Sequence, residues 1–104
     1  MYKEIFKLAE LLTKAAVPFD YNSHTYRGEQ FYQICYPTDE SDNVRCSVIE
    51  TPVSYGNDDD RLEISGLLTE AERRTDDVVG WLTAEDVFRR ITADYKDYQK
   101  ECVE

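Results

Sequence analysis

The stretch FDYNSHTYRGEQFYQICY, residues 19–36, decides the fold because it predicts a β-hairpin. Tyrosines and other residues that favour strands occupy both of its halves. Arg27 and Gly28 interrupt them, as a short turn between two antiparallel strands does, and the second arm covers Phe31 to Tyr36. An antiparallel sheet is therefore the centre of the predicted structure.

Two stretches further along the chain extend this sheet. Residues 44–51 alternate between two faces, as a half-buried strand does. One face holds Val44, Cys46 and Val48, and the other holds Arg45, Ser47 and Ile49. A turn over residues 54–60, built on Gly56 and Asn57, leads into residues 62–68, where apolar side chains recur at every second position. We therefore expect a second hairpin and a sheet of three to four strands.

Helices are predicted at both ends of the chain. Apolar residues recur at helical spacing over residues 2–16 until Pro18, and again over residues 87–102, after a Thr83 and Asp86 cap. Between them, Thr69 and Glu72 have the spacing of a capping box, which predicts a short helical turn. Residues 78–82 are compatible with a strand or a helix, and we expect an extended piece there. The expected fold class is α+β: an N-terminal helix, the antiparallel sheet, and a C-terminal helix packed on one face.

The predicted core joins the sheet to the two helices. Its sheet side is Ile34, Cys46, Val48, Leu62 and Ile64, and its helix side is Leu8, Leu12, Val87 and Ile91. A chain of 104 residues is near the commonest size of one domain, so residues 1–104 are expected to form a single domain.

The acidic residues concentrate in the middle of the chain. The net charge is -10, yet residues 1–37 and 87–104 each carry four basic and four acidic residues, so the whole excess lies in residues 38–86. A pI of about 4.5 disfavours direct binding to nucleic acid or to an anionic membrane surface. The charge serves either solubility alone or an acidic face that binds a basic partner.

The three cysteines and the opening segment indicate a location. Cys35, Cys46 and Cys102 make an odd number, and charged residues interrupt residues 1–19 too often for a signal peptide or a membrane span. We therefore expect reduced thiols without a disulfide, in a protein of the cytosol.

No residue pattern indicates catalysis, a metal or a cofactor. His24 is the only histidine and lies in an expected edge strand, where a structural role is favoured over a nucleophile pair. The cysteines include no CxxC pair, the acidic loops do not fit a calcium loop, and the glycines are isolated. The sequence therefore predicts a protein that is not an enzyme, with no catalytic residue and no bound metal or cofactor.

A resemblance gives a setting for these features. The strings ICYP, CSVIE, SYG, LEISGLLTEAE and VVGWLTAEDVFRRI, within residues 5–92, resemble short proteins encoded by bacteriophages and by mobile elements of gut bacteria. Small acidic proteins of that setting resemble inhibitors of host defence, including anti-CRISPR proteins that occupy a nucleic-acid channel. The matching residues have packing and capping roles, so the resemblance implies a genetic setting and assigns no site residue.

Together these features predict a binding protein that inhibits a host nucleic-acid-handling protein by occupying its basic surface. Carboxylates can compete with phosphates for the same Lys and Arg groups, and tyrosine is favoured at protein interfaces. The expected contact residues are Asp39, Glu40, Asp42, Tyr55, Asp58, Asp59 and Asp60. Two alternatives remain open. One is a binder of a small anionic ligand that would use Arg45, Arg61, Arg73 or Arg74, and the other is a non-catalytic regulatory subunit.

Overall fold

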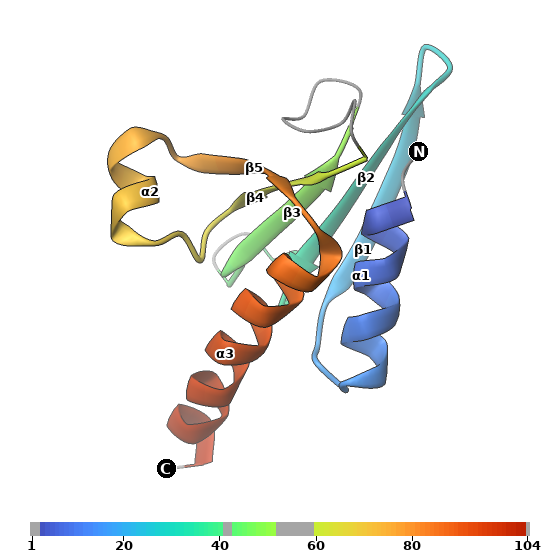
Figure 1. Ribbon diagram of the computed structural model, residues 1–104. Coiled ribbons are helices and arrows are strands. Elements are labelled where there is room, and N and C mark those ends of the chain that lie inside the picture. The colour runs from blue at the N-terminus through green and yellow to red at the C-terminus, as the bar shows by residue number, and fades with distance from the viewer. Residues whose placement is uncertain (1–2, 41–42, 52–59, 104) are drawn as a thin grey trace.

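The computed structural model describes residues 3–40, 43–51 and 60–103, and it shows one antiparallel sheet with two long helices on one face (Figure 1). The elements in chain order are α1 (Lys3–Lys14), β1 (Asp20–Tyr26), β2 (Glu29–Tyr36), β3 (Cys46–Glu50), β4 (Leu62–Ser65), α2 (Glu70–Thr75), β5 (Val78–Leu82) and α3 (Ala84–Val103). The predicted α+β class is confirmed, with α1 at the start of the chain and α3 packed beside it (Figure 1).

The sheet has five strands, where the sequence predicted three to four. Each strand pairs with the next along the chain, in the order β1-β2-β3-β4-β5. The additional strand is β5, which was expected only as an extended piece, and which pairs with β4 through Ser65↔Val78 and Ile64↔Val79. The short helix α2 reverses the chain, so β5 returns antiparallel to β4 and joins the sheet.

The β1–β2 hairpin turns at the predicted dipeptide. Arg27 has φ 52° and Gly28 has φ 80°, and positive φ at both central residues is characteristic of a type I′ turn. Tyr26 pairs with Glu29 across this turn, and the register continues to Asp20↔Cys35. Two turn residues thus fix which side chains of β1 and β2 lie beside each other.

Close contact between two backbones requires a glycine after β4. Gly66 has φ 93°, and a Cβ atom at this position would lie 2.2 Å from the carbonyl oxygen of Arg45. Only glycine combines this conformation with that approach. The end of β4 therefore passes directly against the start of β3.

The core lies between the sheet and the two helices. All nine residues predicted for it have no exposed surface. Other fully buried side chains extend the same cluster: Ile5 in α1, Tyr36 in β2 and Ala84 in α3. Burial of apolar area on this one face is the main stabilising contribution of the fold.

Polar contacts attach the helices to each other and to the sheet. The Lys7 ammonium forms an ion pair with Glu85, and Oε1 of Glu4 accepts a hydrogen bond of 3.1 Å from the Ala84 backbone N–H. Asp94 in α3 accepts hydrogen bonds from Nε and Nη2 of Arg45 at 2.6 and 2.8 Å, and from Oη of Tyr36 at 2.7 Å. These three carboxylates therefore serve the packing of the helices.

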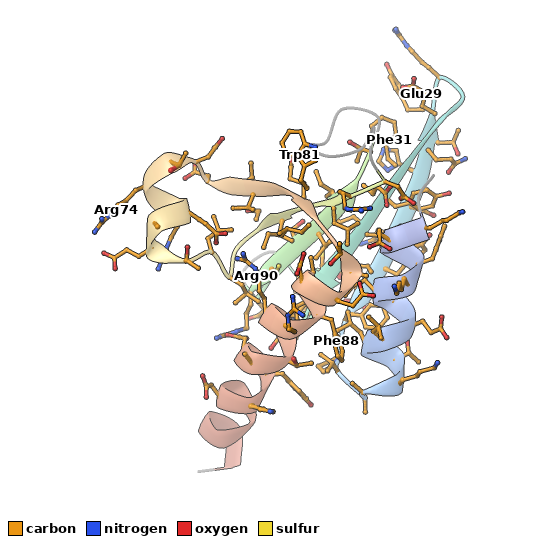
Figure 2. All side chains as sticks on the ribbon, in the orientation of Figure 1. Glu29, Phe31, Arg74, Trp81, Phe88 and Arg90 are labelled. Carbon is orange, nitrogen blue, oxygen red and sulfur yellow. The ribbon has the colours of Figure 1, made fainter. Side chains whose placement is uncertain are left out.

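A similar contact holds α2. The predicted capping box is present, with Thr69 and Glu72 bonded to each other's backbone N–H groups at 2.8 and 3.2 Å. Arg90 of α3 donates to both carboxylate oxygens of Glu72 at 2.8 Å, and Figure 2 shows Arg90 between α3 and α2. The short helix is thus tied to the same side of the molecule as α3.

Candidate functional site

One face of the sheet has none of the three described helices on it, and we call it the uncovered sheet face. It includes the residues of four strands that alternate with the core positions: Asp20, Asn22, His24 and Tyr26 in β1, Glu29, Phe31, Gln33 and Cys35 in β2, Ser47 and Ile49 in β3, and Glu63 and Ser65 in β4. None of the five strands contains a lysine or an arginine. This face therefore presents acidic, amide and aromatic side chains without a basic one from the strands.

The hairpin brings an aromatic pair and two amides together on this face. Its register places His24 opposite Phe31 and Asn22 opposite Gln33. The rings of His24 and Phe31 stack with centroids 4.8 Å apart and planes 7° apart. Figure 2 shows Phe31 near the hairpin turn, beyond the N-terminal end of α1. The aromatic pair lies in the half of the hairpin nearer this turn.

The segment that follows β2 bends back against β1. Oδ2 of Asp20 accepts hydrogen bonds from Oγ1 of Thr38 at 3.0 Å and from the Asp39 backbone N–H at 2.9 Å. These bonds lower the pKa of Asp20 below its usual value. Nδ2 of Asn22 donates to Oδ2 of Asp39 at 3.3 Å, so the Asp39 carboxylate lies beside the uncovered sheet face.

The predicted contact residues divide between the two ends of the sheet. Asp39 and Glu40 follow β2 and are exposed, at the end of β3 where Cys46 lies. Asp60 precedes β4, at the opposite end of β3. The remaining four, Asp42, Tyr55, Asp58 and Asp59, lie outside the described residues. The structure thus brings Asp39 to the uncovered sheet face and places Asp60 at the far end of the sheet.

Asp60 has a structural contact that the sequence analysis did not predict. Its Oδ1 and Oδ2 accept hydrogen bonds of 3.0 and 3.2 Å from the backbone N–H of Lys3, in the first turn of α1. Burial favours a higher pKa for Asp60, but a hydrogen bond from the buried Glu50 and those from the backbone of Glu4 and Lys3 lower it overall. Asp60 therefore stabilises the start of a helix 57 residues away in the sequence.

The cysteines in the strands are buried thiols. Cys35 lies on the uncovered sheet face, and Cys46 lies in the core, so their side chains point to opposite sides of the sheet. Burial raises the pKa of both thiols, that of Cys46 to about 12. A thiol with a raised pKa is a poor nucleophile at neutral pH. Neither cysteine has the surroundings of a catalytic one.

Two of the hollows on the surface of the described part of the chain lie near α2 and on the uncovered sheet face. The larger, about 420 Å³, is lined by Gly66, Leu67, Leu68, Arg73 and Asp77 near α2. The smaller, about 170 Å³, lies on the uncovered sheet face beside His24 and Phe31. Within residues 3–40, 43–51 and 60–103, no three His, Cys, Asp or Glu side chains come together as metal ligands. The helices of this part are also too short or too polar to cross a bilayer.

The four arginines proposed for an anionic ligand have different environments. Arg45 is bonded to Asp94, and Arg74 forms an ion pair with Glu70. Nη1 of Arg61 donates to the backbone oxygen of Asp60, and Arg73 shares the larger hollow with an aspartate. Of the four, Arg73 lines the larger hollow, and none of them lines the smaller one.

Comparisons of the chain with protein-family models, with curated proteins and with solved structures found no match. The sequence contains the pattern that could have revealed the uncovered sheet face: a two-residue turn at Arg27 and Gly28 sets the register of the hairpin. Counting alternately from that turn groups His24 with Phe31 and Asn22 with Gln33.

Proposed function

We propose that this chain is a non-catalytic, acidic binding protein that occupies a basic surface of a host nucleic-acid-handling protein, such as an RNA-guided defence nuclease. The observation that carries the proposal is the uncovered sheet face, whose strands contain acidic residues and no basic one. A phosphate-binding surface is rich in Lys and Arg and is complementary to such a face.

The use of the basic residues on this molecule supports the proposal. Ion pairs such as Lys14 with Glu10, Arg74 with Glu70 and Arg89 with Asp86 each join one basic and one acidic side chain. Each pair cancels one charge of either sign, so such pairs leave the excess of 22 acidic over 12 basic residues unchanged. The charge that remains available to a partner is therefore mainly negative, which accelerates association with a basic surface at low salt.

The contact residues we propose begin at the edge of the uncovered sheet face. Asp39 and Glu40 are exposed there, and Asp42 follows them in the sequence. Tyr55, Asp58 and Asp59 are proposed as a second contact region. Asp60 is better left unchanged in any test, because its bonds to Lys3 would couple a change in binding to a loss of stability.

The experiment is a phage plating assay in a bacterium with an RNA-guided nuclease directed against the phage. Expression of the chain should raise plating efficiency, and the Asp39→Asn, Glu40→Gln, Asp42→Asn variant should lose at least about half of that protection. Binding of the purified nuclease by this variant should be slower and depend less on salt, since fewer charges contribute to the encounter.

A control changes two acidic residues on the helices, Glu10→Gln and Glu70→Gln. Both residues are exposed and paired with a neighbouring base one turn away, so the net charge changes by two, against three in the test variant, without affecting the proposed contacts. Equal losses in both variants would show a non-specific effect of charge. A wild-type chain that protects no phage and binds no such nuclease would contradict the proposed function and favour a regulatory subunit.

A further inference from the structure

The smaller hollow crosses the hairpin on the uncovered sheet face. It has a volume of about 170 Å³, and its lining includes Asn22, His24, Phe31, Gln33 and Ile49. These residues come from three adjacent strands, so rigid backbone pairing fixes their relative positions. We call this hollow the hairpin groove.

Hydrogen bonds orient the two amides of the groove. Nε2 of Gln33 donates to Oγ of Ser47 at 2.8 Å, and Nδ2 of Asn22 donates to Oδ2 of Asp39 at 3.3 Å. Each amide then has its carbonyl oxygen to accept a hydrogen bond and one further N–H to donate one. The polar part of the groove therefore suits a ligand that donates hydrogen bonds.

The aromatic part of the groove suits a flat group. The imidazole of His24 and the ring of Phe31 are nearly parallel, which provides an aromatic wall beside the two amides. Cations favour aromatic faces, and a planar guanidinium can stack on them as well.

The charge around the groove favours a cation. The Asp39 carboxylate is bonded to Asn22 of the groove lining, and Asp20 is the next residue of β1 on the same face. The strands contain no lysine or arginine, and the guanidinium of Arg27 in the hairpin turn lies over the ring of Tyr26, 5.3 Å from its centroid. A donor-rich, planar cation therefore matches the acceptors, the aromatic wall and the charge together.

We propose that the hairpin groove binds the guanidinium group of an arginine side chain presented by the partner. The inference rests on the proposed function for the presence of a basic partner, and it adds the residue type that the partner contributes. Arginine is favoured over lysine because its planar guanidinium can stack on the aromatic wall and donate to two separated acceptors at once. The ammonium group of lysine is a compact point charge that lacks this planar shape.

The test is an NMR titration of the ¹⁵N-labelled full chain with the peptide acetyl-Gly-Arg-Gly-amide. We expect a dissociation constant on the order of 1 mM, with chemical-shift changes centred on Asn22, His24, Phe31 and Gln33. The same peptide with citrulline, which keeps the shape without the charge, should bind roughly tenfold more weakly. The lysine peptide should fall between the two.

Two substitutions in β2 form a matched pair for this test. Gln33→Leu removes an amide from the groove and should weaken arginine binding about fivefold. Gln30→Leu removes an exposed amide that bonds Oγ1 of Thr25 outside the groove lining, and binding should be unchanged. Phe31→Leu removes the aromatic wall and should also weaken binding. The dispersion of each variant's spectrum shows whether it remains folded.

Equal affinity for the arginine and citrulline peptides, or shift changes away from the hairpin, would overturn the inference. The titration involves no host protein, so this result would not contradict the proposed function, which would then rest on the acidic contact residues alone. Arginine binding in the groove together with a complete lack of protection in the plating assay would instead contradict the proposed function alone.

Discussion

Along β2 and β3, neighbouring residues belong to opposite faces of the sheet and have different surroundings. Ile34 and Val48 are completely buried against the helices, whereas Gln33 and Ile49, one position away, line a groove that is open to solvent. The same strands thus contribute one surface that holds the fold together and another that is available to a partner. Changes on the two faces should therefore have separable consequences.

The acidic residues divide in the same way. On the side of the helices, Asp94 of α3 accepts a hydrogen bond from Tyr36. Glu72 accepts one from Arg90 of α3, and Glu4 accepts one from the backbone of Ala84 at the start of α3. On the uncovered sheet face, Asp39 is exposed and accepts one bond from an exposed asparagine. A net charge of -10 therefore overstates how many carboxylates are available for binding, because some of them already have structural partners.

The largest expected difference comes from truncating an isoleucine on each face. Ile64→Ala should lower the free energy of unfolding by about 2–5 kcal/mol, because it leaves a cavity in the core. Ile49→Ala should lower it by less than about 1.5 kcal/mol, since the partly exposed side chain leaves no closed cavity. Urea denaturation of both variants measures the difference, and equal losses would contradict the assignment of the two faces.

A smaller difference is expected between two aspartates. Asp94→Ala should cost about 1–3 kcal/mol, because it removes the acceptor of the hydroxyl of Tyr36, which is completely buried. Asp39→Ala should change stability by no more than about 0.5 kcal/mol, as is usual for exposed positions. Thermal and urea unfolding give both values. An equal loss of stability in the Asp39 and Asp94 variants would show that the uncovered sheet face also contributes to the stability of the fold.

Local patterns predicted most of the fold. The hairpin, both long helices, the capping box at Thr69 and all nine predicted core residues follow from contacts within a few residues or from alternation. The fifth strand could not be predicted as part of the sheet. The sequence of Val78 to Leu82 is compatible with a strand or a helix. These residues form a strand because they pair with β4, and this contact lies outside the segment itself.

The candidate site was less accessible to sequence reasoning. In the sequence, residues 39–42 and 58–60 are two similar acidic clusters. In the structure, β3 lies between them, so their described members lie at opposite ends of the sheet. The bond of Asp60 to Lys3 and the bond of Gln33 to Ser47 each join segments that no local pattern relates. The orientation of the groove amides therefore emerges only once the strands are paired.

The smallest expected effect concerns the ion pair that ties α2 to the covered side. The hydrogen bonds from Arg90 and from the backbone of Thr69 lower the pKa of Glu72 from 4.5 to about 2. A carboxyl group whose pKa is lowered on folding stabilises the protein above its unfolded pKa, and this contribution is lost as the pH falls towards the folded pKa. The contribution of Glu72 is therefore full above about pH 4.5 and disappears between pH 4.5 and 2.

The variant Glu72→Gln isolates this contribution, because glutamine retains the capping box with Thr69 but has no charge to pair with Arg90. Glu72 is partly exposed to solvent, so the variant should be less stable at pH 7 by no more than about 1 kcal/mol. Urea midpoints of the two proteins, compared at several pH values, should converge as the pH falls from 4.5 towards 2. Other carboxylates titrate in the same range, but they affect both proteins equally. A difference that stays constant or grows at low pH would show that the charge of Glu72 does not hold α2 in place.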